Sequence, residues 1–228
     1  DLHSFPTRRS SDLNAGYGVP SRFFNERSQR MLKMCGLEGQ ERRLARELSG
    51  GVKQRLALGC AILHEPEVVF LDEPTAGVDP ISRRQFWDLI GELAAQGVAI
   101  FVTTHYLDEA ENCHRVGLMY QGRLVALGSP QGLKDGMKAG VMVEVQCRER
   151  LKALRLVRSV PFLDRATLFG SRLHLLVEDA SQAEVEVRRK LESEGISVDR
   201  FEPIPFSLED LFVIFIDMEE QRRRETSG

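Results

Sequence analysis

The chain has 228 residues, a formal net charge of −3 and four cysteines. This length suits one domain plus a smaller one, and the near-neutral charge excludes the basic footprint of a nucleic-acid partner. Cys35, Cys60, Cys113 and Cys147 are scattered without CxxC pairs, which indicates free thiols rather than a disulfide framework or a metal site. No apolar run approaches the roughly 18 residues of a spanning helix, so we expect a cytoplasmic protein.

Residues 1–13, DLHSFPTRRSSDL, have no hydrophobic periodicity and no run that would form a core. A disordered or targeting segment is the default interpretation of such a stretch. The string is also a direct translation of a short-read sequencing adapter. We therefore expect an assembly artefact here, with natural sequence resuming near Asn14 and the native protein extending further upstream.

The next elements are two predicted helices. The first covers 20–35 and ends at Gly36. The second follows Leu48-Ser49-Gly50-Gly51, where Ser49 is the predicted N-cap and the glycines leave the first amides uncovered, which favours anion binding. The alternative is an ordinary flexible glycine pair before a helix. The predicted apolar stripe of this helix consists of Val52, Leu56, Cys60 and Leu63.

The run 68–71 is apolar and starts with two β-branched residues, which predicts a strand of a parallel sheet, buried on both faces. Asp72 and Glu73 end it, where open α/β sheets bind their ligands. Asp72 would hold Mg²⁺ and Glu73 would act on a water molecule. The alternative is a turn that happens to be acidic.

A second strand follows a helix that begins at Asp79-Pro80, by the usual cap rules, and ends at Gly97. The strand covers 98–102 and delivers Thr103, Thr104 and His105 to the same sheet edge as Glu73. A lone histidine is more often structural than catalytic. At this position in a strand–helix–strand unit, however, His105 is a candidate contact for a phosphate.

These residues together resemble the ATPase domain of ABC transporters, because four motifs occur in the expected order. Residues 48–52 stand for the signature motif, 69–73 for the Walker B strand, 77–79 for the D-loop and His105 for the switch histidine. The resemblance implies that Glu73 polarises the attacking water, Asp72 serves Mg²⁺ and His105 contacts the γ-phosphate of ATP. It also implies that Ser49, Gly50 and Gly51 bind the ATP of a second ATPase subunit, and that Asp79 couples the two sites.

Two departures from the family pattern stand out. Val52 replaces the glutamine of the signature, which we interpret as a variant. The larger departure is that the chain contains no Gly-Lys pair, and therefore no P-loop of the usual Gly-x-x-x-x-Gly-Lys-Ser/Thr pattern. The glutamine loop between P-loop and signature is missing too. We expect this polypeptide alone to be inactive.

The second half of the chain predicts a hairpin over 116–127, a linker over 129–140 and a small α+β domain over 141–216. Ser181-x-x-Glu184 predicts a capping box, and Ser207-x-x-Asp210 opens a final helix through Phe215. His174 alternates within a strand and is expected to be structural. The charged residues 217–228 form a tail that we expect to be frayed.

The predicted fold is α/β: the C-terminal part of a P-loop-type ABC ATPase domain, a parallel sheet with flanking helices over 14–135, plus the accessory domain. The resemblance implies the ATP-binding and ATP-hydrolysing subunit of an ABC exporter, with ATP and Mg²⁺ as cofactors. Its partners would be a second ATPase subunit and an integral membrane permease, which holds it at the inner face of the cell membrane. The alternatives are a soluble ABC ATPase of ribosomes or DNA, and a non-catalytic fragment.

Overall fold

The computed structural model describes residues 21–41, 43–137, 140–160 and 163–226. The chain divides into two compact units, Asp1–His105 and Tyr106–Gly228. The division differs from the boundary expected near 136–140, because the hairpin after His105 shares an apolar cluster with the last helix. The predictions for residues 1–13 and for the start of the first domain lie outside the described residues.

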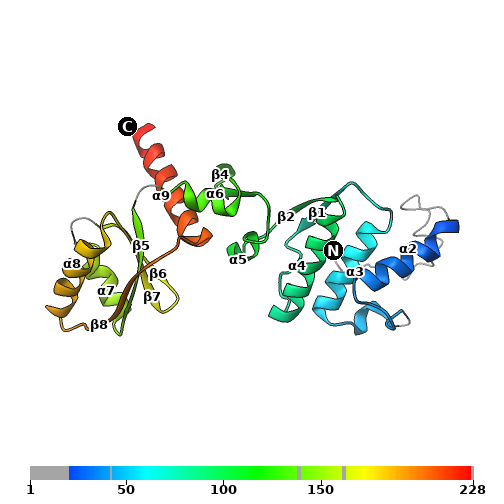
Figure 1. Cartoon of the computed structure of the whole chain (residues 1–228), viewed down its shortest axis with the longest axis horizontal. Helices are drawn as coiled ribbons and strands as arrows, with labels where there is room; N and C mark the ends of the chain where they lie inside the picture. Colours follow the sequence, from blue (N-terminus) through cyan, green and yellow to red (C-terminus); the bar gives the residue numbers. More distant parts are fainter. Residues whose placement is uncertain (1–20, 42, 138–139, 161–162, 227–228) are drawn as a thin grey trace. The chain divides into compact units, whose positions relative to one another are not determined.

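The first unit contains three helices, a short 3-10 turn and two strands in its described part. These are α2 (Ser21–Met34), η1 (Ala45–Glu47), α3 (Gly50–Ile62), β1 (Val68–Asp72), α4 (Pro80–Ala95) and β2 (Ala99–Thr103). Helix α2 packs on α3, α3 packs on α4, and α4 packs on β2 (Figure 1). The predicted strand–helix–strand unit is therefore present, with β1 and β2 paired in parallel.

The prediction that these strands are buried on both faces is wrong. Val69 is 4% exposed, whereas Phe70, its neighbour on the opposite face, is 75% exposed. Phe101 lies beside Phe70, with the ring centroids 5.7 Å apart, and is exposed as well. The reason is that, in the part of the chain that the structure describes, β1 and β2 form a two-stranded sheet, and the side chains of β1 alternate between a buried and an exposed face.

The predicted apolar stripe of α3 is only partly correct. Its last member, Leu63, is buried as predicted, but Val52, Leu56 and Cys60 are partly buried, while Leu58, Gly59 and Ile62 are buried in their place. The reason is the close approach of α2: a Cβ added at Gly59 would lie 2.4 Å from the sulfur of Met31. Only glycine leaves enough room for this helix contact, and a pattern of hydrophobic residues does not identify a glycine as a buried position.

All four cysteines are free, as the sequence predicted. Cys35 is buried against α3, and burial, followed by the neighbouring Cys60, raises the pKa of its thiol to about 11. A thiol with so high a pKa stays protonated at neutral pH and behaves as a small apolar side chain.

The second unit has a four-stranded antiparallel sheet with strand order β6-β7-β5-β8. Its elements are α5 (Leu107–Ala110), β3 (Val116–Tyr120), β4 (Arg123–Gly128), α6 (Pro130–Asp135), β5 (Val141–Cys147), α7 (Arg150–Val157), β6 (Leu163–Phe169), β7 (Arg172–Val177), α8 (Ala180–Glu192), β8 (Val198–Ile204) and α9 (Leu208–Thr226). Helices α7 and α8 pack against the sheet over a core that includes Val143, Leu175 and Leu191. The expected α+β domain is thus observed.

Three local predictions in this unit need correction. The expected linker over 129–140 contains α6, because Ser129 caps it by accepting a hydrogen bond from the Gly132 amide. The N-cap of α8 is Asp179, not Ser181, and its carboxylate accepts from two backbone amides. The expected tail over 217–228 is helical as far as Thr226, since α9 continues through it.

Two features explain the length of α9. The predicted helix start at Ser207-x-x-Asp210 is confirmed, and these two residues exchange backbone-to-side-chain hydrogen bonds there. Near its far end, the Tyr120 hydroxyl donates to Glu220 at 2.8 Å and Arg223 reaches Gln121, which ties the helix to the β3–β4 turn. These tethers join residues far apart in sequence, so a local pattern does not reveal them.

His174 of β7 lies in a buried polar cluster beneath α9. Its Nδ1 is 2.7 Å from Asp210 Oδ1, and its Nε2 is 3.6 Å from Glu144 Oε2. Burial lowers the pKa of His174, but the hydrogen bond and charge of Asp210, followed by those of Glu144, outweigh it and raise the pKa above its usual value. Burial raises the pKa of Asp210, yet its bonds with His174 and Ser207 bring it below the usual range. This burial agrees with the structural role that the sequence predicts for His174.

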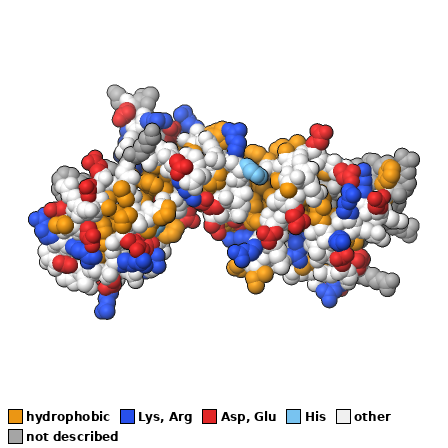
Figure 2. Space-filling view, viewed as in Figure 1, with side chains coloured by type: hydrophobic (Ala, Val, Ile, Leu, Met, Phe, Trp, Pro, Cys, Tyr) orange, Lys and Arg blue, Asp and Glu red, His pale blue; other side chains and the backbone are white. Residues whose placement is uncertain are grey.

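Within the described part of the chain, no helix has the length and apolar character needed to cross a membrane. On the face shown in Figure 2, lysine and arginine side chains are interspersed with aspartate and glutamate. That mixture agrees with the small net charge of −3.

Candidate functional site

The parallel pairing of β1 and β2 brings the predicted chemical residues to one edge. Asp72 is in register with Thr103, so the two strands end at the same level. Glu73 follows one strand end and His105 follows the other. The structure therefore brings Asp72, Glu73 and His105 together at the predicted edge. Thr103, which was also predicted there, contacts Asp72 through its hydroxyl.

Glu73 and His105 contact each other directly. The distance from His105 Nδ1 to Glu73 Oε2 is 2.6 Å, and the side chains are 60% and 38% exposed for His105 and Glu73, respectively. A pair this open leaves room for a ligand or a water molecule at either group. A carboxylate that is hydrogen-bonded to an imidazole and open to solvent is suited to accept a proton from water.

The backbone of Glu73 has an unusual conformation. Its φ is +46°, in the left-handed region that residues with a Cβ rarely adopt. The Glu73 amide donates to the carbonyl oxygen of Thr103 at 3.0 Å and to the Thr103 hydroxyl at 3.3 Å. Such strained residues concentrate at functional sites, where surrounding contacts hold them in place.

Asp72 is exposed at the end of β1, and the Thr103 hydroxyl donates to its Oδ1. Among the residues that the structure describes, no cluster of three or more His, Cys, Asp or Glu side chains is placed to hold a metal by itself. Mg²⁺ in nucleotide sites is usually held by one or two carboxylates, water and the substrate phosphates. Asp72 therefore fits a Mg²⁺ ion that arrives with a nucleotide.

Ser49, Gly50 and Gly51 begin α3 as predicted. Ser49 occupies the N-cap position, but its side chain makes no capping hydrogen bond. A Cβ added at Gly50 would meet nothing within 4 Å, whereas one at Gly51 would lie 2.3 Å from the Cβ of Ser82. Gly51 is thus required by the close approach of α4, while Ser49 and Gly50 lie at an open helix N-terminus, a geometry that favours anions.

Asp79 is the N-cap of α4. Its Oδ1 accepts hydrogen bonds from the amides of Ile81 at 3.1 Å and Ser82 at 2.9 Å. The hydrogen bonds from Ser82 lower the pKa of Asp79 below its usual value. Through Ser82 this cap lies beside Gly51, so the structure groups Asp79 with the α3 N-terminus.

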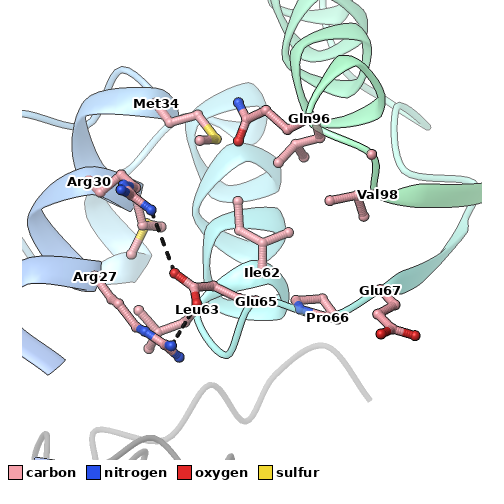
Figure 3. Close-up of a pocket in the computed structure, with 13 residues that line it drawn as sticks. Arg27, Arg30, Met34, Ile62, Leu63, Glu65, Pro66, Glu67, Gln96 and Val98 are labelled. Carbon is pink, nitrogen blue, oxygen red and sulfur yellow. Dashed lines mark ion pairs between the residues drawn. The ribbon is translucent and has the colours of Figure 1, made fainter. Parts of the chain in front are cut away.

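A cavity of about 340 Å³ in the first unit contains none of these predicted residues. It lies between α2 and the loops that precede β1 and β2, and Arg27 and Arg30 form ion pairs with Glu65 at its rim (Figure 3). The sequence does not predict this cavity. Its lining comes from three separate segments, so no local pattern could have indicated it.

The first unit is an α/β domain, with acidic and imidazole groups at the ends of two parallel strands and a glycine-rich helix start. Residues 5–76 match the sequence model of the ABC transporter family. The chain is a relative of ABC transporter ATP-binding proteins, and members of that family are generally ATPases.

Three relatives illustrate the match. The chain is 50% identical over 118 residues to "Probable multidrug ABC transporter ATP-binding protein YbhF" of Escherichia coli, covering 52% of this chain and 20% of that protein. It is 35% identical over 192 residues to "Daunorubicin resistance ATP-binding protein DrrA2" of Streptomyces coeruleorubidus, covering 82% and 59%. It is 32% identical over 198 residues to "Nod factor export ATP-binding protein I" of a Rhizobium species, covering 86% and 62%.

Among solved structures, cbiO1 from Clostridium perfringens, described as part of the ABC transporter complex cbiONQ, aligns with a TM-score of 0.52 and 26% identity. The alignment covers 71% of this chain and 61% of that one. The chain thus spans a fifth of the first relative named above and about three fifths of the others.

Proposed function

We propose that this chain is part of the ATP-binding and ATP-hydrolysing subunit of an ABC exporter, which powers transport through a separate integral membrane permease. The observation that carries the proposal is the 2.6 Å contact between His105 and Glu73 at an open sheet edge beside Asp72. The relatives named for multidrug transport, daunorubicin resistance and Nod factor export support the assignment to export.

Each group at the edge has a role in this proposal. Glu73 polarises the attacking water, and His105 orients Glu73 and contacts the γ-phosphate. Asp72 holds Mg²⁺, which, when bound with ATP, neutralises charge on the phosphates. The protein's contribution is positioning and electrostatics, because phosphoryl transfer leaves it little covalent chemistry.

The second group of residues acts on the partner. Ser49, Gly50 and Gly51 bind the γ-phosphate of ATP held by a second ATPase subunit. Two observations support this role: the start of α3 is open at Gly50, and the Ser49 side chain makes no capping hydrogen bond. The Asp79 carboxylate is engaged by two amides, so we assign it a role in holding the D-loop against that helix start. The subunit would be cytoplasmic and held at the inner face of the membrane through the permease.

The 228-residue polypeptide by itself is expected to hydrolyse no ATP, because its sequence has no Gly-Lys pair to form a phosphate cradle. The test therefore compares this polypeptide with the complete gene product, the protein translated from the whole gene.

A soluble ABC ATPase of ribosomes or DNA is the second candidate. Co-purification of the complete gene product with membranes, rather than with ribosomes or DNA, distinguishes the two.

The decisive variant is Glu73→Gln in the complete gene product. We expect it to lower steady-state ATP hydrolysis by about 100-fold or more while ATP binding is retained, since it removes the base and not the phosphate contacts. Glu67→Gln, which changes an exposed carboxylate just before β1, is the matched control and should leave turnover unchanged. Turnover that survives Glu73→Gln, or Glu73-dependent turnover by the 228-residue polypeptide, would contradict the proposal.

A further inference from the structure

The side chain of Thr103 lies between the two acidic residues of the candidate site. Its hydroxyl donates to Asp72 Oδ1 and accepts a hydrogen bond from the Glu73 amide at 3.3 Å. A hydroxyl has one proton to donate and lone pairs to accept, so one group serves both neighbours at once. Valine has the same shape and can do neither.

The backbone of Thr103 reinforces this arrangement. Its carbonyl oxygen accepts from the same Glu73 amide at 3.0 Å, so that amide is shared between two acceptors of one residue. Glu73 needs such support, because its φ of +46° is unfavourable for a residue with a Cβ. The direction in which the Glu73 side chain leaves the strand, toward His105, depends on that conformation.

We propose that Thr103 is a positioning residue that holds the Asp72 carboxylate and the left-handed backbone of Glu73 in one fixed arrangement. The inference deepens the proposed function and rests on it for its catalytic consequence. Thr103 acts through Asp72 and Glu73 and does not itself contact substrate. Its hydroxyl fixes the position of the Asp72 carboxylate, which receives Mg²⁺, relative to the Glu73 carboxylate, which polarises water.

The first test uses the 228-residue chain and needs no activity. Amide hydrogen exchange of Glu73 and the carboxyl ¹³C shift of Asp72 are measured by NMR in the wild type, Thr103→Val, Thr103→Ser and a control, Thr167→Val in β6. Thr103→Val should speed exchange at Glu73 by about fivefold, the typical effect of one hydrogen bond, and shift the Asp72 carbon. Thr103→Ser should behave as the wild type at both positions, and Thr167→Val should change neither.

The second test uses the complete gene product and separates kcat from KM. Thr103→Val should lower kcat for ATP about tenfold and raise the Mg²⁺ concentration needed for half-maximal turnover, with the KM for ATP within about twofold. Thr103→Ser should restore both parameters.

The outcomes separate this inference from the proposed function. Wild-type exchange at Glu73 in Thr103→Val, or wild-type kcat in that variant, overturns the role of Thr103. A wild-type complete gene product without ATPase activity overturns the proposed function instead, and the exchange measurement then still decides whether Thr103 holds Glu73.

Discussion

The two units each contain a histidine paired with a carboxylate at nearly the same distance, in opposite surroundings. His105 and Glu73 are 2.6 Å apart, with side chains 60% and 38% exposed. His174 and Asp210 are 2.7 Å apart, with side chains 5% and 2% exposed. The first pair sits at the open ends of parallel strands, and the second lies beneath a helix and over an antiparallel sheet.

Because the two pairs differ mainly in burial, we expect the two contacts to have different consequences. An exposed pair is screened by water, adds little to stability and stays accessible to a ligand. A buried pair is costly to break, because the partner left behind is an uncompensated buried group. Breaking the exposed pair should therefore change chemistry, and breaking the buried pair should change folding.

The largest expected effect on stability comes from Asp210→Ala. It leaves His174 without its main partner and removes the capping box with Ser207, so we expect the second unit to lose about 3–5 kcal/mol of unfolding free energy. Hydrogen exchange of β7 and α9 in urea measures this loss. Fluorescence of Trp87, the single tryptophan and a buried residue of α4, reports separately on the first unit and should be unaffected.

Asp217→Ala is the matched control for that variant. Asp217 lies on the same helix and pairs with Arg165 at 2.8 Å, but its side chain is 46% exposed. Its removal should cost less than about 1 kcal/mol. Equal losses in the two variants would show that burial does not distinguish the pairs.

The pH dependence of the second unit gives a smaller effect whose sign follows from the pKa shifts. The pKa of His174 is raised in the folded state, so its stabilisation is full below the ordinary value of 6.5 and is lost as pH rises through the folded pKa. The pKa of Asp210 is lowered, so its stabilisation is full above 3.8 and is lost as pH falls through the folded pKa.

The second unit should therefore be most stable between these two values. Urea unfolding followed by hydrogen exchange across a pH series measures the curve. His174→Gln should remove the decline on the alkaline side. If the stability of the wild-type second unit rose from pH 6.5 to 8.5, His174 and Asp210 would not form a stabilising charged pair.

The smallest effect concerns a pair of helix caps, one in each unit. Asp79 and Asp179 each accept two backbone amides at the start of a helix. Replacing either by alanine should lower the melting temperature of its unit by about 2–4 °C, as measured by scanning calorimetry. Only Asp79→Ala should also lower ATP turnover of the complete gene product; an equal loss of turnover in Asp179→Ala would argue against a special role for the D-loop.

Much of this fold could be predicted from local patterns. The strands at 68–72 and 172–177, the proline-started helix α4 and the Ser207–Asp210 cap all follow from short-range signals. The burial of β1 could not be predicted, since the exposure of Phe70 depends on which elements cover the sheet. The extent of α9 was missed because its tethers to the β3–β4 turn join distant segments.

The candidate site shows the same limit. The sequence alone predicts that Asp72, Glu73 and His105 lie at one edge, because they follow the ends of two parallel strands. The role of Thr103 could not be predicted without the register of the two strands, because its hydroxyl contacts two residues at the end of the neighbouring strand. The positive φ of Glu73 likewise has no signal in the residue type, as glutamate rarely adopts it.

The most direct test of the central claim changes the histidine of each pair in the same way. His105→Gln and His174→Gln are made in the complete gene product, and ATP turnover per folded molecule is measured beside urea unfolding of each unit. We predict that His105→Gln lowers turnover about 100-fold with unchanged unfolding, and that His174→Gln destabilises the second unit with turnover within about twofold of the wild type. Unchanged turnover in His105→Gln, or an equal loss in both variants, would contradict the account.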